Sequence, residues 1–236
     1  LEAFADDYLS TVRLTHQALR RQSPGARVYI SLEHHWNIRY PGGTEKQTFA
    51  GRPFVEYFHR RAKEGGDFDW HVAFHPYPEN LFEPRTWKDT SATTNVLTTP
   101  RITFRNLGLL PEYLRQPELR FEGKARRILL SEQGFHTPKG DDGEGVQAAA
   151  YCYAWKQVAR LEGIDAFILH RHVDHGQEGG LKLGLWSRDE SAAFPAAPKS
   201  RKRIYEVFRA AGTPDENRAF EFALPIIGLE SWEELR

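Results

Sequence analysis

Four short apolar runs along the chain each end in a cluster of polar and aromatic residues. Each run is short enough to form a buried parallel strand, and a segment with helical spacing follows each one, sooner or later. The polar clusters read Glu-His-His-Trp, His-Pro-Tyr, Ser-Glu-Gln-Gly-Phe-His and His-Arg-His-Val-Asp. The runs with their polar ends cover residues 28–36, 70–77, 128–136 and 166–174, and the predicted strands span 27–32, 70–74, 127–131 and 166–169.

Helical spacing of apolar residues predicts the helices of the chain. In the first segment Phe4, Tyr8, Val12 and Leu19 lie on one helical face, and a Ser-Pro-Gly sequence ends the segment. The predicted helices span residues 3–21, 53–62, 100–116, 146–161 and 199–211, and the tail after residue 213 is expected to hold a short strand and a closing helix at 231–235.

The order of the elements is a helix, then four strand–loop–helix units, then the tail. This order is typical of parallel β-α-β units. A complete (β/α)8 TIM barrel takes about 250 residues and eight strands. Four units with a leading helix therefore predict an α/β fold that forms the C-terminal half of a TIM barrel over residues 1–212, with residues 213–236 as a tail that packs on it. An open sheet of four or five strands is the structural alternative.

The beginning of the chain fits a partial barrel. The sequence contains no Met, starts at Leu1 and opens directly on an amphipathic helix. We therefore expect the amino end to lie inside a longer protein, with the N-terminal half of the barrel as the partner of this chain.

Charge and composition exclude several classes of partner. Basic and acidic residues number 32 each, so no net field favours nucleic acid or an anionic membrane. No apolar run approaches the roughly 18 residues that span a bilayer. Cys152, which is the one cysteine, cannot form an internal disulfide and is expected to be a small buried hydrophobe. The basic run at 199–203 is typical of a solvated first helical turn.

Histidines gather at the predicted strand ends. Parallel α/β folds place their chemistry at the carboxyl ends of the strands, so this distribution predicts a functional site there. The long Pro- and Thr-rich segment 75–100 is a type of loop that often carries function. Eight of the ten histidines belong to this group: His34, His35, His71, His75, His136, His170, His172 and His175.

Two carboxylates at strand ends are candidates for catalysis. Glu132 follows three aliphatic residues and stands between Ser131 and Gln133, where a carboxylate can act as nucleophile or general acid/base. A carboxylate paired with a neighbouring Arg or Lys is the structural alternative. Glu33 ends another predicted strand, and a structural or substrate-hydrogen-bonding role fits it better than the role of second catalytic carboxylate.

The His-Pro-Tyr sequence at the end of the second strand is a candidate for orienting a carboxylate. Pro76 biases His75 toward extended geometry, so its ring can face a cleft. Tyr77 can donate a hydrogen bond to a catalytic carboxylate. A turn with a half-buried tyrosine is the structural alternative.

The His-x-His sequence after the fourth strand raises the question of a metal. His170 and His172 lie on one face of a strand, and Asp174 can serve as a third zinc ligand. Arg171 stands between the two histidines, and no second His-x-His occurs at another strand end. We therefore expect neither a metal nor any other cofactor, and keep a metal-dependent hydrolase as an alternative.

Aromatic residues near the strand ends favour a carbohydrate ligand. An indole face stacks on the C–H face of a sugar ring while the hydroxyls bond at its edge. Anchoring of loops in a small hydrophobic core is an alternative for any one tryptophan. The residues concerned are Trp36, Tyr40, Trp70, Trp87, Phe135 and Trp186.

Three segments together resemble a known group of barrels. They are Ser31–Trp36, Phe74–Pro78 and Ser131–Phe135. They resemble clan A glycoside hydrolases and, more closely, a bacterial family of glycoside-hydrolase-like domains of unknown function, over about residues 1–210. The resemblance implies that Glu132, at the end of strand seven, is the nucleophile, and that the His75–Tyr77 segment of strand six contacts it. It also implies a secreted or periplasmic location.

The chain departs from the clan pattern at one point. The acid/base Glu of the clan follows an Asn at the end of strand four, just before the helix that corresponds to residues 3–21. No Asn-Glu pair precedes that helix here. The resemblance therefore implies that the chain carries the nucleophile and lacks the acid/base.

We predict a retaining glycosidase that hydrolyses the O-glycosyl bonds of a poly- or oligosaccharide. Glu132 is its nucleophile, and His75 and Tyr77 orient it. The alternatives are the metal-dependent hydrolase and a non-catalytic carbohydrate-binding barrel. The predicted substrate-binding residues are Glu33, His34, His35, Trp36, His136, His170, His172 and Trp186.

Overall fold

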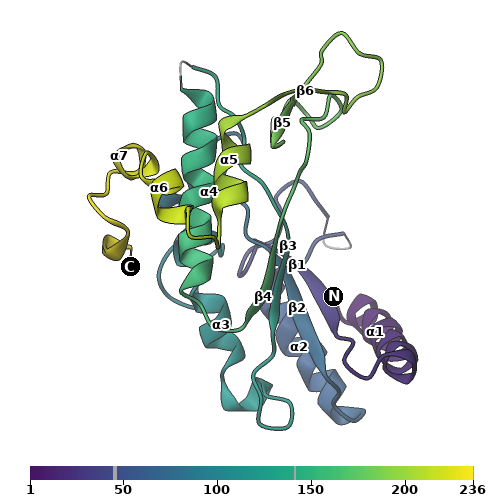
Figure 1. Ribbon diagram of the computed structural model, residues 1–236. Coiled ribbons are helices and arrows are strands. Elements are labelled where there is room, and N and C mark those ends of the chain that lie inside the picture. Colours follow the sequence, from purple (N-terminus) through teal and green to yellow (C-terminus); the bar gives the residue numbers. More distant parts are fainter. Residues whose placement is uncertain (45–46, 141, 236) are drawn as a thin grey trace.

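A computed structural model describes residues 1–44, 47–140 and 142–235. Its main layer is a four-stranded sheet, and a two-stranded hairpin stands apart from it (Figure 1). The strands are β1 (Val28–Glu33), β2 (Trp70–His75), β3 (Ile128–Gln133), β4 (Ile164–Leu169), β5 (Trp186–Arg188) and β6 (Pro198–Arg201). The helices are α1 (Glu2–Gln22), α2 (Gly51–Glu64), α3 (Leu109–Leu114), α4 (Gly143–Ala159), α5 (Arg203–Ala210), α6 (Glu216–Phe220) and α7 (Ala223–Ile227), with short 3-10 helices at Thr86–Lys88, Phe104–Asn106, Pro117–Leu119 and Trp232–Glu234.

The main sheet is parallel throughout, in the order β1-β2-β3-β4. The first pair runs in register from Val28 opposite Trp70 to Glu33 opposite His75. Because parallel strands end at the same edge of a sheet, the four polar clusters of the sequence meet at this edge.

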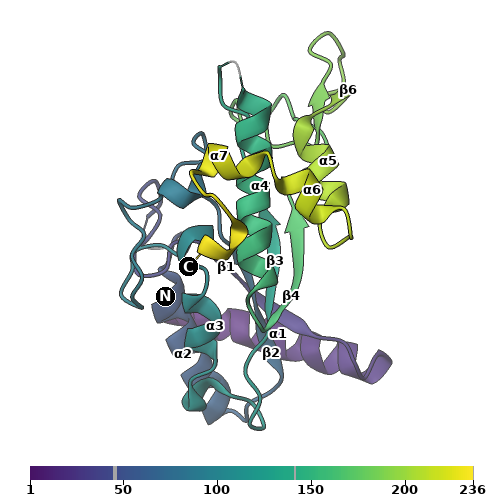
Figure 2. The same ribbon diagram turned by 60° about the vertical axis from the view of Figure 1, so that its left-hand side comes forward.

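Alternation of side chains places the core on one face of the sheet. On β1, Val28, Ile30 and Leu32 are buried, whereas Ser31 and Glu33 are exposed. Helices cover the buried face, and Figure 2 shows α4 lying along the sheet with α5, α6 and α7 packed around it. We call the other side, which carries Ser31 and Glu33, the open face. Parallel sheets are usually covered on both faces, so the exposure of Ser31 and Glu33 on the open face is unusual.

The sheet curves toward its open face. The Tyr29 hydroxyl on β1 donates a 2.6 Å hydrogen bond to Asp165 on β4, although two strands lie between them. Arg127 of the segment before β3 also binds the Asp165 carboxylate, at 2.6 Å. The amino-terminal ends of the two outer strands are therefore within hydrogen-bonding reach of each other.

The structure confirms the predicted parallel β-α-β order and corrects several boundaries. The predicted helix at 199–211 begins later, because Pro198–Arg201 pairs with β5 as an antiparallel strand and only Arg203–Ala210 is helical. The predicted helix at 100–116 is a 3-10 turn followed by α3. In residues 213–235 the structure has short helices and no strand.

The tail and the cysteine both belong to the packed core. Phe220 and Ala223 are fully buried and join the same core as the sheet, and α7 packs against α4. Cys152 is fully buried in α4, as the sequence predicts. In the described ranges, no helix combines the length and the apolar character that a bilayer crossing needs.

Candidate active site at the carboxyl ends of the strands

A cavity of about 550 Å³ lies at the edge where the parallel strands end. Its walls include Glu33 of β1, Tyr77 after β2, Glu132 of β3 and His170 after β4. The parallel topology therefore brings together four residues that are spread over more than half of the sequence.

Glu132 stands at an irregular point of β3. The pairing with β4 passes from Leu130 directly to Gln133, so a bulge falls at Ser131 and Glu132. Bulges of this kind redirect side chains and occur often beside active sites. Glu132 is exposed and lines the cavity.

Tyr77 fixes the position of the Glu132 carboxylate. Its hydroxyl donates a 3.0 Å hydrogen bond to Glu132 Oε1. Burial, followed by the negative charge of Glu132, raises the pKa of Tyr77 far above its ordinary value. The charges of Glu33 and Glu178, which line the same cavity, raise the pKa of Tyr77 further. Tyr77 therefore remains protonated and remains a donor at neutral pH.

His75 makes its hydrogen bonds beside Glu132 rather than to it. Its Nδ1 lies 3.2 Å from Glu33 Oε1, and its Nε2 lies 2.9 Å from Ser131 Oγ. The hydrogen bond with His75 holds the pKa of Glu33 below its ordinary value, so Glu33 is anionic at neutral pH. His75 can therefore influence the position of Glu132 only through Ser131, the residue that precedes Glu132 in the chain.

His34 and His35 are buried, neutral imidazoles. Burial, as the largest cause, lowers the pKa of His34 to about 4 and lowers that of His35 as well. The Nδ1 of His34 bonds the Tyr77 carbonyl oxygen at 3.2 Å. Both ring nitrogens of His35 are buried and find no hydrogen-bond partner among the described residues. The His35 ring therefore forms part of the cavity wall, while both of its nitrogens are enclosed by protein atoms.

Sequence reasoning missed several residues that line the cavity, Glu178 and Arg101 among them. Glu178 Oε1 lies 2.6 Å from His170 Nε2, and Arg171 lies 3.3 Å from the same oxygen. Arg101 reaches the wall from the end of the long loop and donates to the Glu79 carbonyl oxygen at 2.6 Å. Arg101 follows the long loop 75–100, and Glu178 lies in the loop after β4, so neither residue stands at a strand end.

Several predicted substrate-binding residues lie away from the cavity. Trp36 is fully buried with its ring edge-on to Tyr113, so its prediction as a sugar contact is wrong. His172 is exposed outside the cavity wall. His136 is buried and accepts a hydrogen bond from the Lys182 backbone.

Trp186 also serves packing. Its ring lies edge-on to Tyr205, and the Arg201 guanidinium stacks over it at 5.3 Å from the ring centroid. It lies on the β5–β6 hairpin and does not line the cavity.

The residues of the metal alternative are held by other partners. Asp174 is buried, accepts a 2.7 Å hydrogen bond from the Gly184 backbone and pairs with Lys202 at 2.8 Å. Across residues 1–44, 47–140 and 142–235, no three His, Cys, Asp or Glu side chains are arranged to hold a metal ion.

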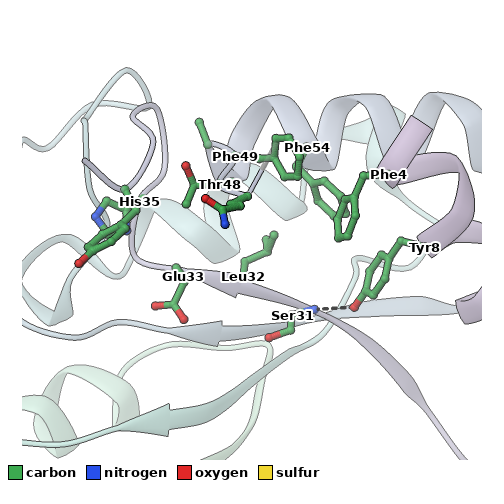
Figure 3. Close-up of a pocket in the computed structure, with 13 residues that line it drawn as sticks. Phe4, Tyr8, Ser31, Leu32, Glu33, His35, Thr48, Phe49 and Phe54 are labelled. Atoms are coloured by element: carbon green, nitrogen blue, oxygen red, sulfur yellow. Dashed lines mark hydrogen bonds between the residues drawn. The ribbon is translucent and has the colours of Figure 1, made fainter. Parts of the chain in front are cut away.

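A second cavity, of about 350 Å³, adjoins the first along the outer edge of β1. Glu33 and His35 line both cavities. Figure 3 shows Phe4 and Tyr8 above the strand, with the Tyr8 hydroxyl accepting a 3.2 Å hydrogen bond from the Ser31 backbone N–H. This cavity therefore combines an aromatic wall with the outer strand of the sheet.

A family model for a family of unknown function, DUF5722, matches residues 1–235. The chain belongs to this family. No curated protein matches the sequence.

Two solved structures share the fold. One is the β-glycosidase BGL167, with a TM-score of 0.50 and 17% identity over 94% of this chain and 48% of that chain. The other is a family 39 glycoside hydrolase from the gut symbiont Bacteroides cellulosilyticus WH2, with a TM-score of 0.51 and 12% identity over 90% of this chain and 46% of that chain. The family member described here thus spans about half the length of either structure, and the resemblance to glycoside hydrolases is confirmed at the level of the fold.

Proposed function

We propose that this chain carries the nucleophile of a retaining glycosidase, and that Glu132 is that nucleophile. The observation that supports it most is the 3.0 Å hydrogen bond from Tyr77 to Glu132 at the carboxyl end of a parallel strand. The fold that this chain shares with two glycoside hydrolases also supports glycoside hydrolysis, by analogy of fold.

The geometry suits nucleophilic attack at a sugar. The Tyr77 hydroxyl binds Oε1 of Glu132, which leaves Oε2 to attack the anomeric carbon and form a glycosyl ester. Water then hydrolyses the ester with retention of configuration. The hydrogen bond holds the carboxylate in one orientation and stabilises its charge between attacks.

Neutral histidines favour a sugar over a charged ligand in this cavity. The His35 ring lines this cavity, and burial lowers its pKa, so the ring is uncharged at neutral pH. His34 and His170 extend the same wall. We propose that Glu33, His34, His35 and His170 contact a bound poly- or oligosaccharide.

A retaining site needs a second carboxyl group about 5–5.5 Å from the nucleophile. Glu33 and Glu178 each already bind a histidine. We propose that polypeptide outside residues 1–236 completes a (β/α)8 barrel and supplies the acid/base. The nearest strand of that polypeptide would pair with the outer side of β1, because β1 ends the order of the described strands and α1 packs beside it, as a crossover helix would.

The test is turnover of aryl glycosides by the full-length protein. Glu132→Gln should lower kcat by at least about 1,000-fold, because the amide cannot form the glycosyl ester. Glu190→Gln is the matched control, since the Glu190 side chain is 71% exposed in a loop away from the cavity. Equal rates in the two variants would disprove the role of Glu132.

A carbohydrate-binding barrel without turnover is the second candidate. It is favoured by the histidine partners of Glu33 and Glu178, which leave neither carboxylate free to act as acid/base. Oligosaccharide binding that persists in the absence of any turnover by the full-length protein would support it.

A further inference from the structure

His75 lies between a hydroxyl and a carboxylate on the open face of the sheet. Its Nε2 is 2.9 Å from Ser131 Oγ, and its Nδ1 is 3.2 Å from Glu33 Oε1. The three side chains come from the adjacent strands β1, β2 and β3. A hydroxyl on one imidazole nitrogen and a carboxylate on the other is the arrangement of a serine nucleophile, its general base and the group that orients the base.

The charge of Glu33 and the tautomer of His75 also fit a general base that is held by a carboxylate. Glu33 is anionic at neutral pH, because its hydrogen bond with His75 lowers its pKa. An anionic carboxylate selects the imidazole tautomer that carries its proton on Nδ1. The Nε2 lone pair then faces Ser131 Oγ and can accept its proton.

The three residues are accessible to a ligand. The Glu33 side chain is 62% exposed and that of His75 is 13% exposed. Ser131 is half-buried on the open face. The irregular β3–β4 pairing between Leu130 and Gln133 places Ser131 at a bulge, a feature that often re-aims side chains beside active sites.

We propose that Ser131, His75 and Glu33 form a second catalytic site that hydrolyses carboxylic esters. Its substrate class is an acyl ester of a carbohydrate hydroxyl, and only the carbohydrate part of this statement rests on the proposed function. The Glu33 carboxylate also lines the large cavity, so an acylated sugar bound there would lie next to the site.

The reaction balances without a cofactor. Ser131 Oγ attacks the ester carbonyl carbon, and its proton passes to His75 Nε2. The ester C–O bond then breaks, and the alcohol leaves with the proton from His75. Water attacks the acyl group on Ser131 and gives one proton to His75. That proton returns to Ser131 Oγ as the carboxylic acid departs.

The first test uses a fluorophosphonate reagent and the ester 4-nitrophenyl acetate on the full-length protein. We expect the reagent to modify Ser131, as located by peptide mass spectrometry. Ser131→Ala should abolish the modification and lower ester hydrolysis by about 100-fold or more. Glu33→Gln should lower kcat about tenfold and leave KM unchanged, because Glu33 positions the base and does not bind this substrate.

Ser31→Ala is the matched control, because Ser31 is exposed on the same face, two residues before Glu33. It should react as the wild type does. Modification of another residue, or ester hydrolysis by Ser131→Ala within twofold of wild type, would overturn the proposal. His75→Gln gives an independent check should Ser131→Ala fail to fold.

The second test concerns the substrate class. Release of acetate from an O-acetylated oligosaccharide should depend on Ser131. If the protein hydrolyses 4-nitrophenyl acetate but releases no acetate from the oligosaccharide, the assignment of a carbohydrate ester as substrate is overturned. The first two reagents contain no sugar, so their outcome is independent of whether Glu132 is a glycosidase nucleophile.

Discussion

At the scale of the residue, the proposed nucleophile depends on one hydroxyl. Tyr77→Phe removes the hydrogen bond to Glu132 and leaves the ring packed in place. We expect kcat for glycoside hydrolysis to fall about 100-fold, by analogy with the loss of one preorganised donor. Steady-state kinetics on the full-length protein measures this. Tyr57→Phe, which loses a hydroxyl on α2, is the control and should keep wild-type kcat.

Buried histidines make stability depend on pH. Burial lowers the pKa of His34 and of His71 to about 4 in the folded protein, against about 6.5 in the unfolded chain. Between these values the unfolded state binds more protons, so the free energy of unfolding falls as pH drops from 6.5 toward 4. Each histidine contributes on the order of 2 kcal/mol.

Urea unfolding at pH 5 and pH 7 measures this dependence. Asp89 acts in the opposite direction, because burial raises its pKa to about 6 and its contribution declines as pH rises from 4 to 6. His71→Asn isolates one histidine, since the amide oxygen can still accept from the Arg127 backbone N–H. We expect a flatter pH dependence in this variant, and an unchanged one would contradict the assignment.

The sequence predicted which polar residues stand at the strand ends, but it did not predict the direction in which each side chain packs. Glu132 and Tyr77 each come within three residues of the end of an apolar run, so their place at the sheet edge follows from the parallel order. Trp36 has the same position in the sequence, yet its ring turns into the core against Tyr113. Glu178 and Arg101 enter the cavity from loops, where no periodicity predicts the direction of a side chain.

At the scale of the element, one buried ion pair fastens the segment between β4 and α5. Lys202 Nζ binds Asp174 at 2.8 Å and Thr137 at 2.9 Å, and both charged residues are buried. Asp174→Ala leaves the ammonium group without its counter-charge, which typically costs about 3–5 kcal/mol. The same segment carries His170 and Glu178, which line the cavity, so we expect disorder of the segment to displace part of the cavity wall.

A double variant tests whether the unpaired charge of Lys202 causes the loss of stability in Asp174→Ala. Asp174→Ala with Lys202→Met removes both charges, and we expect it to recover at least half of the stability lost in Asp174→Ala. Urea unfolding of the two variants and the wild type gives the comparison. A double variant as unstable as the single one would show that the charge of Lys202 is not the cause.

The same segment explains a wrong boundary. The basic sequence at 199–203 was predicted as a first helical turn, but the exposed residues Pro198–Arg201 pair with β5. Strand pairing depends on a partner from elsewhere in the chain, and a hydropathy pattern over a few exposed residues does not contain that information.

At the scale of the whole molecule, the fold is a parallel sheet in which, among the described residues, no further strand pairs with β1 or with the outer side of β4. Its curvature brings Tyr29 of β1 to Asp165 of β4, and the chain spans about half the length of two glycosidase structures that share its fold. The order of elements sufficed to predict the parallel sheet. The open face and the second cavity could not be foreseen, because they depend on which edges find partners.

Covalent trapping tests the central claim most directly. The full-length protein is incubated with 2-deoxy-2-fluoro glycosides that carry a good leaving group, and the digested protein is examined by mass spectrometry. We predict one fluoroglycosyl adduct on the peptide that contains Glu132, and none in Glu132→Gln. An adduct on another carboxylate, with Glu132 unmodified, would contradict the account.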